Sequence, residues 1–546
     1  MVNDRVFELI ESYLEELDKA QFTSEHPNGQ STIYRPFFSS IAVKSTQYNE
    51  LLIQNGGTMV NSKILKPDYI ARLETRIGDY EKGGSAAYNY ISLPRDLDIE
   101  PSMIDLWITA NNNFWDSVDE YEQRYGNTLG VKNSRDKFLY MSREPAHKFI
   151  EDEKKIDVDW KGIEAMLKDV SKTFSNYPEI LISTMAFTIN NDGNYFVNSE
   201  GAKIFTSYAR YSLGITMYAH GLDNLAIPIT TALHSIDLST IPTEEQLIEL
   251  GEKLREELSD IIKAPIQRNG LFPAILDYEN HGVIWHEAVG HALEGHRMQE
   301  DEFNGSVSLF NGKIDEQIAP GFLSLYDDPT VETLDGHYKF DSEGVRAQKV
   351  MLVEGGVLKN YLHSRQSAGY FKTRSNGHCR ESIDDVAINP LQKLISQGPC
   401  PRMSNLFVES ANETSFEELT ENLIKLCEEQ GREYGLILQG CGGGIAMPEE
   451  SFFNTYPAHV HRVHKNGDIE RVRGIYIVGT PYQILDNIIQ TSDQYGLFNG
   501  TCGAESGWVP STQVAPDALV KSLEVNTIPR DNYPIIREPV LPKPKF

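Results

Sequence analysis

The chain contains 546 residues, more than one hydrophobic core usually organises, so we expect two or three domains. Hydrophobic residues make up 40% of the sequence and charged residues 24%, values near those of globular proteins. The 79 acidic residues outnumber the 50 Lys and Arg residues, which gives a formal net charge of -29. Such an acidic surface repels phosphate backbones and argues against nucleic-acid binding.

The sequence also argues against a membrane-spanning helix and against secretion. No apolar stretch approaches the ~18 residues that a membrane-spanning helix needs. The N-terminal segment has no basic stretch followed by an uninterrupted apolar one, so it does not resemble a signal peptide. The five cysteines are widely spread and odd in number, which fits reduced thiols better than a disulfide framework. We therefore expect a cytoplasmic protein.

The N-terminal half is predicted to mix helices and strands. Residues 101–126 and 159–174 have helical patterns, and the charged, aperiodic segment 127–158 between them is interpreted as a connection or subdomain edge. From about residue 180, β-branched and aromatic runs broken by Asn, Asp and Gly predict strands. The chain begins with an amphipathic helix whose apolar face comprises Val6, Phe7, Leu9, Ile10, Tyr13, Leu14 and Leu17.

A capping box marks the next helix. Thr243 can cap the helix start, and Gln246 three residues later can bond back to it. The domain boundary is placed just after this helix, which divides the chain into 1–263 and 264–546. The helical stripe comprises Leu247, Leu250, Leu254, Leu258 and Ile261.

The C-terminal half is predicted to be rich in β-structure. Hairpin turns are expected at residues 355–356 and 466–467, and Ser415 caps a further helix. The Gly- and Asp-rich segment 301–344 is interpreted as a lid, a chamber wall or an ordinary surface loop. Together the patterns predict the α+β class, in which long helices cover antiparallel sheets, with an N-terminal α/β domain and a β-rich C-terminal domain.

The segment "VIWHEAVGHALEGHRM", residues 283–298, carries the most specific chemistry. Zinc proteases commonly place two histidines four apart on a helix, about 40° from each other around its axis. Here His286 and His291 are five apart and diverge by about 140°, so a regular helix cannot aim both at one ion. We therefore predict a distortion between Glu287 and His291, either a single π turn or a bend at Gly290.

If a metal binds there, Glu287 adjoins the first ligand and is placed to act as general base. Glu294 is a competing ligand, because it shares a helical face with His291 at a spacing of three. His296 is interpreted as a residue at the rim or behind the ligands. The alternative interpretation is a half-buried helix whose histidines make only ordinary hydrogen bonds.

A third protein ligand must come from elsewhere in the chain. Cys441 and Cys502 both lie in glycine-rich segments, and the residues alone leave the choice open. His459 and His461 alternate on a predicted strand and face the same way, which is more often a surface pair than a metal site. No ligand pattern surrounds the remaining cysteines, which are Cys379, Cys400 and Cys427.

The sequence resembles the TldD/PmbA family of zinc metallopeptidases, specifically the TldD-like branch that carries the HExxxH motif. The similar segments include "NSEGAKI", "VIWHEAVGHALEGH", "PRMSNLFVE" and "TCGAESGWVPSTQVAPDALV". They occur in the family's order and span roughly residues 190 to 525. One departure is His296, where the family pattern has Asp.

The resemblance implies a zinc-dependent peptidase with one Zn2+ per subunit. It implies that His286, His291 and Cys502 bind the metal and that Glu287 is the catalytic base. It also implies a homodimer, or a heterodimer with a PmbA-like (TldE) subunit, that encloses the active sites. Such enclosure would restrict substrates to short or unfolded polypeptides, added as extended strands to an exposed sheet edge.

Two other functions are considered beside the peptidase. A non-catalytic binding or assembly subunit would keep the ion as a structural staple, held by four protein ligands. A nucleic-acid-associated regulator is disfavoured by the acidic charge. His363, Arg365 and Asn405 are further candidates for contact with the substrate backbone, with structural hydrogen bonding as the alternative for each.

Overall fold

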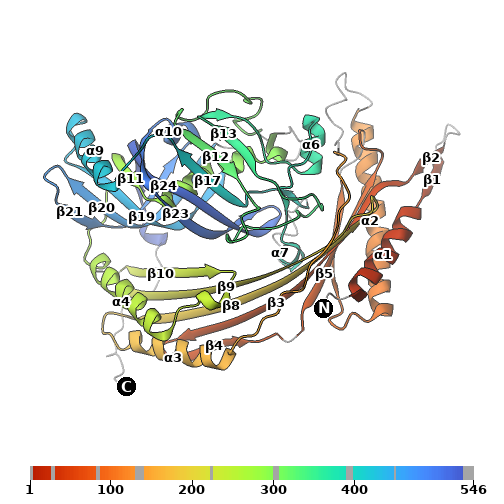
Figure 1. Cartoon of the computed structure of the whole chain (residues 1–546), viewed down its shortest axis with the longest axis horizontal. Coiled ribbons are helices and arrows are strands. Elements are labelled where there is room, and N and C mark those ends of the chain that lie inside the picture. Colours follow the sequence, from red (N-terminus) through yellow and green to blue (C-terminus); the bar gives the residue numbers. More distant parts are fainter. Residues whose placement is uncertain are drawn as a thin grey trace.

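The architecture was obtained as a computed structural model, and it consists of two large sheets with helices packed against them (Figure 1). Most strands pair antiparallel, with a few parallel pairs such as β17 with β24 and β11 with β19. This arrangement confirms the predicted α+β class. The structure describes residues 4–25, 31–64, 66–81, 86–128, 141–221, 225–298, 307–388, 398–447 and 451–532.

The first sheet belongs to the N-terminal part of the chain. Its strands follow the order β10-β9-β8-β3-β5-β6, with β4 paired to β3 and β7 paired to β9. The strands are β3 (Pro36–Gln54), β4 (Gly57–Ser62), β5 (Asp68–Ile77), β6 (Ala87–Leu93), β7 (Lys148–Ile150), β8 (Ile182–Asn198), β9 (Lys203–His220) and β10 (Ala226–Ser235). A separate small ladder joins β1 (Phe22–Glu25) to β2 (Ser31–Tyr34).

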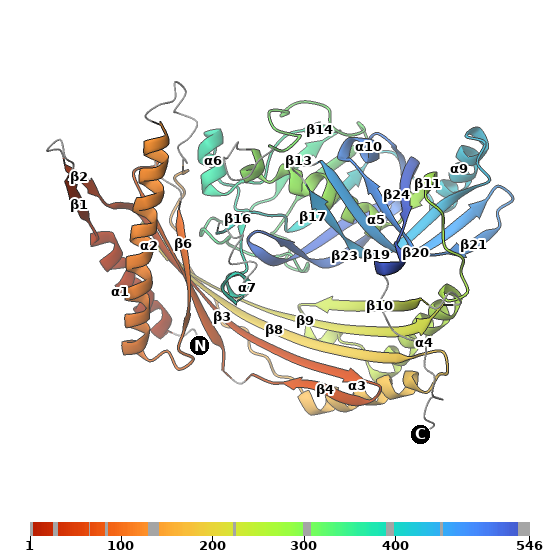
Figure 2. The same ribbon diagram turned by 180° about the vertical axis from the view of Figure 1, so that it is seen from behind.

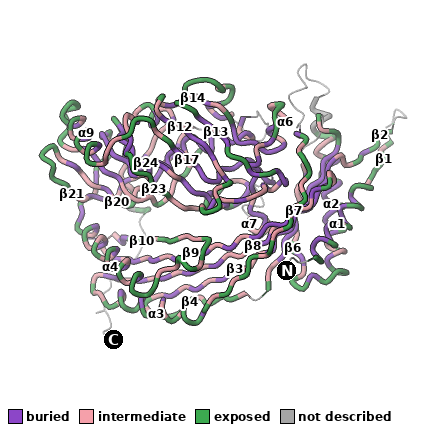
Figure 3. Tube along the Cα trace, viewed as in Figure 1, coloured by how far each residue is buried: buried purple, intermediate pink, exposed green. Residues whose placement is uncertain are grey.

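Four helices cover one face of this sheet. They are α1 (Asp4–Lys19), α2 (Ile99–Thr128), α3 (Trp160–Ser175) and α4 (Glu244–Ile261). Because side chains alternate along a strand, the odd-numbered residues of β3 and β8 face these helices and form two apolar clusters with them. Figure 3 shows exposed residues gathered on the outer sides of α3 and α4.

The predicted N-terminal elements agree well with these helices. All seven residues of the predicted apolar face of α1 are buried. The helices predicted over 101–126 and 159–174 correspond to α2 and α3, and Thr243 and Gln246 form the predicted capping box of α4. In the predicted connection 127–158, residues 129–140 lie outside the described residues, and β7 lies near its end.

The second sheet occupies the C-terminal part and holds twelve strands among the described residues. The strands are β11 (Gly270–Leu276), β12 (Leu323–Asp327), β13 (Val350–Glu354), β14 (Val357–Leu358), β17 (Asn405–Ser410), β18 (Glu413–Thr414), β19 (Tyr434–Met447), β20 (Phe452–His464), β21 (Ile469–Val472), β22 (Ile475–Gly479), β23 (Ile488–Ala504) and β24 (Gly507–Thr527). A short separate ladder joins β15 (Cys379–Arg380) to β16 (Cys400–Pro401). The helices of this part include α5 (Tyr278–Trp285), α6 (Arg365–Phe371), α7 (Ile383–Ile388), α9 (Phe416–Glu429) and α10 (Pro481–Leu485).

The predicted turns and caps of this half are confirmed. Residues 355–356 separate β13 from β14, and residues 466–467 separate β20 from β21. Ser415 caps α9 through the backbone N–H of Glu418. In the predicted loop 301–344, residues 301–306 lie outside the described residues, and β12 interrupts the rest. The boundary predicted between residues 263 and 264 falls between α4 and β11 and stays a prediction.

The C-terminal part lies against the concave face of the first sheet, as both views show (Figures 1 and 2). Among the ion pairs that link them, Arg72 of β5 bonds Glu381 at 2.7 Å, and Lys44 of β3 bonds Asp384 at 2.7 Å. The even-numbered face of the first sheet supplies charged side chains to the junction, and it also packs an apolar cluster of Ala42, Ile70, Phe196 and Ile204 against Ile383 of α7.

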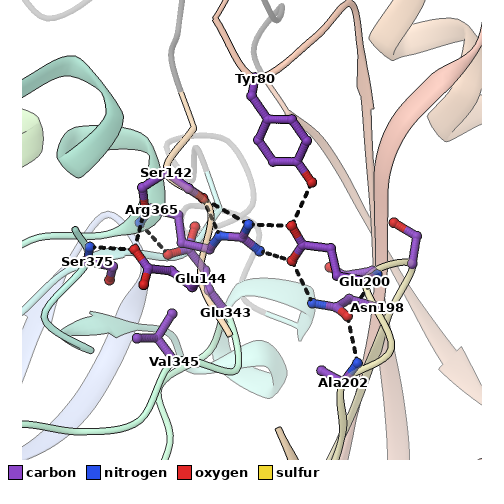
Figure 4. Close-up of polar contacts among 12 residues, drawn as sticks. Tyr80, Ser142, Glu144, Asn198, Glu200, Ala202, Glu343, Val345, Arg365 and Ser375 are labelled. Carbon is purple, nitrogen blue, oxygen red and sulfur yellow. Dashed lines mark hydrogen bonds and ion pairs between the residues drawn. The ribbon is translucent and has the colours of Figure 1, made fainter. Parts of the chain in front are cut away.

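A third link is made by Arg365 at the start of α6 (Figure 4). Its guanidinium donates to both carboxylate oxygens of Glu200, at 2.7 and 2.8 Å, and to the carbonyl oxygen of Ser142. Tyr80 donates a further hydrogen bond to Glu200. Arg365 is therefore occupied in a buried structural contact, which favours the structural alternative over the predicted contact with substrate.

No described helix is long and apolar enough to cross a membrane. None of the five cysteines, all of which are described, forms a disulfide.

Candidate metal centre

The helix that carries the two histidines changes its winding at the motif. It begins as α5, capped by Asp277, and becomes a π-helix over His286–Gly290. The backbone N–H of His291 bonds the carbonyl oxygen of His286, five residues back, and a 3-10 turn follows over His291–Leu293. The predicted distortion is therefore confirmed, in the form of the π turn.

This winding brings the two imidazoles to one thiol. Nε2 of His286 lies 3.1 Å from Sγ of Cys502, and Nε2 of His291 lies 3.4 Å from the same sulfur. The two rings stand perpendicular, with centroids 5.0 Å apart. Cys502 comes from β23, more than 200 residues further along the chain, where it pairs with Val509 of β24. All three side chains are buried.

The donor set fits a zinc ion. Zinc binds imidazole nitrogen at about 2.0 Å and thiolate at about 2.3 Å, and a tetrahedral array of such ligands places their atoms about 3.5 Å apart. The two measured nitrogen–sulfur distances lie near that value, and the three ligand atoms lie within 4.8 Å of one another. Nitrogen and sulfur donors are also those that zinc prefers over oxygen.

Each histidine also makes a polar contact through Nδ1, the ring nitrogen that does not face Cys502. Glu294 is fully buried, and its Oε1 lies 2.9 Å from Nδ1 of His291. The side-chain amide of Gln513 lies 2.9 Å from Nδ1 of His286. A carboxylate at Nδ1, as Glu294 provides for His291, accepts the ring proton and orients the imidazole so that Nε2 faces the ion. Glu294, predicted as a competing ligand, thus lies on the far side of the His291 ring from Cys502.

Arg402 supports the thiolate form of Cys502. Its Nη2 donates to both Sγ and the carbonyl oxygen of Cys502, at 3.1 and 2.7 Å. Burial alone would raise the pKa of the Cys502 thiol, but Arg402, His291 and His286 together lower it well below its usual range. Because a thiol binds metal as the thiolate, this environment prepares Cys502 as a ligand.

Glu287 lies beside the ligand atoms without joining them. Its Oε2 is 4.0 Å from Nε2 of His291. Burial raises the pKa of Glu287 above its ordinary value. Gly444 of β19 packs against this side chain so closely that an added Cβ would lie 2.6 Å from Cγ of Glu287. The glycine-rich segment of β19 thus borders the carboxylate.

The other predicted candidates lie in different settings. Cys441 is near α5, where its backbone N–H bonds Glu279, and it does not join the histidine pair. His459 is 3.2 Å from Glu257 and also contacts Arg471, so it makes ordinary polar contacts. His363 and Asn405 are buried and make local hydrogen bonds, to Ser367 in one case and to Gly336 and the carbonyl oxygen of Asp328 in the other.

Arg402 and Gln513 were not predicted as functional residues. They lie within the segments "PRMSNLFVE" and "PSTQVAP". No sequence pattern around either residue indicates contact with a histidine helix more than 100 residues away. The only available signal was the presence of polar residues inside otherwise apolar strand segments.

A cavity of about 400 Å³ lies beside the site, between the first sheet and the C-terminal part. Its wall includes Thr501 and Val509, the chain neighbour and the cross-strand partner of Cys502. Charged groups of both signs line it, among them Lys44, Arg210 and Asp384.

The part of the chain that contains this site matches a known family model. The model of the PmbA/TldA metallopeptidase C-terminal domain matches residues 269–527, which include the histidine helix and the cysteine hairpin. This part of the chain is therefore similar to the C-terminal domain of the TldD/PmbA family. The matched range begins just before β11 and ends with β24, so the second sheet corresponds to that domain.

Proteins similar to this chain are named metalloproteases. A metalloprotease of Methanothermobacter thermautotrophicus is 27% identical over 346 residues, covering 63% of this chain and 70% of the relative. A zinc metalloprotease TldD homologue of Saccharolobus solfataricus is 24% identical over 374 residues, covering 67% and 76%. Among solved structures, TldE from Thermococcus kodakarensis aligns with a TM-score of 0.61 at 14% identity, covering 96% of this chain and 100% of that one. This last similarity concerns the fold alone.

Proposed function

We propose that this protein is a zinc-dependent peptidase that hydrolyses short or unfolded polypeptides, with Glu287 as general base. The observation that carries the proposal is the convergence of His286, His291 and Cys502 around one point with a carboxylate beside them. The names of the relatives support the same class of reaction.

Three donors, rather than four, favour a catalytic site. Structural zinc sites are usually closed by four protein ligands, whereas catalytic sites keep one position open. Among the described residues, the group around Cys502 contains three donors, and Glu294 is turned to the far side of His291. The arrangement therefore supports a peptidase better than a non-catalytic assembly subunit in which the ion is a staple.

Each residue of the site has its own role in the proposed reaction. A bound zinc ion would supply Lewis-acid chemistry, polarising the scissile carbonyl and lowering the pKa of water. Glu287 accepts the proton of the attacking water, and the same carboxyl then delivers a proton to the leaving amine. Because burial raises the pKa of Glu287, the carboxylate is a stronger base than one in open water. His286, His291 and Cys502 hold the ion, and Arg402 keeps the thiolate charged.

The glycine-rich end of β19 suggests how a polypeptide is presented. Between Cys441 and Met447, the described strands pair with β19 on the β20 side only. The other edge offers backbone groups to an extended peptide, a common mode of peptide capture. Gly444 packs on Glu287, so a peptide added along this edge runs past the base. The sequence requirement at such an edge is weak, because the contacts are made by main-chain atoms.

The partner we propose is a second subunit of the same family, either another copy of this chain or a PmbA/TldE-like chain. The likeness in fold to TldE supports this assignment. The state in solution is measured by light scattering coupled to gel filtration. A mass of one chain at micromolar concentration, with full peptidase activity, would exclude an obligatory homodimer.

The peptidase proposal is tested with Glu287→Gln, which keeps the shape of the side chain and removes its charge. We expect the variant to retain zinc and to lose about 10²- to 10⁴-fold in cleavage of a fluorescently labelled unfolded protein. Cys502→Ser should lose the zinc of this site and the activity together. Glu249→Gln, on the exposed face of α4, is the matched control and should behave as the parent. Full cleavage by zinc-loaded Glu287→Gln would show that the base is wrongly assigned.

A further inference from the structure

A second cluster of metal-binding side chains lies close to the first. It comprises His296, Cys400 and Glu505, whose ligand atoms all lie within 4.8 Å of one another. The three come from different segments: the 3-10 turn Gly295–Met298 after the histidine helix, strand β16, and the turn between β23 and β24. None of them belongs to the site formed with Cys502.

The polar groups of this cluster are only partly satisfied by the protein. Nε2 of His296 lies 2.5 Å from Oε1 of Glu505, but Nδ1 of the same ring is shielded from solvent and has no hydrogen-bond partner. Cys400 is 8% exposed, so its thiol is also withdrawn from water. A buried polar group without a hydrogen-bond partner destabilises the folded protein, so each such group in a native structure calls for an explanation, such as binding of an ion.

The chemistry of the three donors defines a ligand class. Imidazole, thiol and carboxylate together form a set that suits zinc and related divalent transition metals, whereas Mg2+ and Ca2+ prefer oxygen donors alone. The thiol of Cys400 has a hydrogen-bond partner in Ser506, but a thiol is only a weak donor and acceptor, so this bond does not account for a cysteine at the position.

We propose that His296, Cys400 and Glu505 form a second site for a thiophilic divalent cation such as Zn2+, separate from the site at Cys502. Binding releases the thiol proton of Cys400 to solvent, and three protein ligands leave a fourth position for water. The cation ties the turn after the histidine helix to the hairpin that carries Cys502.

The second site is coupled to the first through two arginine side chains. Arg297 bonds Oε2 of Glu505 at 3.0 Å and Oε2 of Glu294 at 2.9 Å, and Glu294 in turn holds His291. Arg402, two residues after Cys400, bonds Cys502. A cation at the second site therefore steadies residues that orient two ligands of the first site.

The ion pair of Glu505 with His296 and Arg297 is the competing explanation, and it predicts no metal. The two are separated by titrating the metal-free full-length protein with Co2+, whose bond to a thiolate produces a charge-transfer absorption band. We expect two Co2+ per chain in the parent. Cys502→Ser should still bind one Co2+ with a thiolate band, and Cys502→Ser/Cys400→Ser should show none. Cys427→Ser, on the buried face of α9, is the matched control and should keep the parent's two ions.

His296→Asn is the second variant, in case Cys400→Ser does not fold. Combined with Cys502→Ser, it should weaken the remaining Co2+ at least 10-fold while the thermal melting curve stays cooperative. A thiolate band that is absent in Cys502→Ser, or that survives in Cys502→Ser/Cys400→Ser, would overturn the second site. These readouts do not involve peptide cleavage, so a failure of the proposed peptidase function leaves the test intact.

Discussion

Oε1 of Glu294 lies 2.9 Å from Nδ1 of His291, on the side of the ring opposite to the nitrogen that faces Cys502. Glu294 is itself fully buried and bonded to Arg297. Burial would raise the pKa of Glu294, but His291 and Arg297 lower it to about 2, so the carboxylate stays charged. A charged acceptor at Nδ1 holds the proton there and leaves Nε2 free for a metal.

Replacing this charge should weaken the metal site without dismantling it. Glu294→Gln keeps the shape and one hydrogen-bond acceptor, and we expect zinc affinity to fall about 10- to 100-fold. The measurement is competition with a chromogenic chelator at constant pH. Glu316→Gln, on the protein surface, is the control and should leave affinity unchanged. An unaltered zinc affinity in Glu294→Gln would mean that the orientation of His291 is set by packing alone.

Gly290 is predicted to be intolerant of any side chain. A Cβ at this position would lie 1.9 Å from Sδ of Met403, which is itself fully buried. We expect Gly290→Ala to cost about 1–3 kcal/mol of unfolding free energy, since overpacked cores must shift backbone or side chains. Urea unfolding of Gly290→Ala, Met403→Ala and the double variant measures this. The double variant should be less destabilised than the sum of the single changes, and strict additivity would contradict the clash.

The stability of the protein should depend on pH through Asp517. Burial raises the pKa of its carboxyl from 3.8 to about 6 in the folded protein. The folded state therefore binds this proton more tightly than the unfolded state, so the stabilisation is complete below pH ~4 and is lost as pH rises through ~6. Relative to Asp517→Asn, the parent should lose stability across that window. Thermal unfolding of both metal-free proteins at several pH values gives the comparison, and parallel curves would refute it.

Removing the charge of Glu200 should loosen the junction between the two parts. Arg365 is buried and bonds both oxygens of this carboxylate, so Glu200→Gln leaves a buried guanidinium without its counter-charge. Breaking a buried pair in this way costs about 3 kcal/mol. We expect a lower midpoint of urea unfolding with zinc content unchanged. Lys253→Gln, which breaks the exposed pair with Glu249, is the control and should shift stability by less than about 0.5 kcal/mol.

Features of local origin were predictable from the sequence. The apolar face of α1, the capping box at Thr243 and the turn at residues 466–467 each depend on residues within a few positions of one another. The π turn was also predictable, because two histidines five apart can share a metal only if the helix is rewound. The site at Cys502 came from the resemblance to a family, since spacing alone left Cys441 as an alternative.

Features that depend on distant partners were not predictable. β3 pairs with β8, about 150 residues further on, and no pattern in either strand identifies the other as its pairing partner. Arg402 looked like an ordinary polar residue, and its role follows only from the folding of β16 against the hairpin that carries Cys502. For the same reason the sequence left open whether Arg365 contacts substrate or makes a structural bond, because its partner Glu200 lies in the turn between β8 and β9 of the first sheet.

The π turn also constrains how this motif can change. Deleting Ala288 or Val289 would convert the motif to the four-residue spacing common in other zinc proteases, and it would return the backbone to ordinary α-helical winding. The same deletion would leave the spacing of His291, Glu294 and Arg297 unchanged, so these residues would shift together relative to His286 and to Glu505, which Arg297 bonds. The HExxxH motif and the segment that follows it therefore depend on each other, and a change in one requires a compensating change in the other.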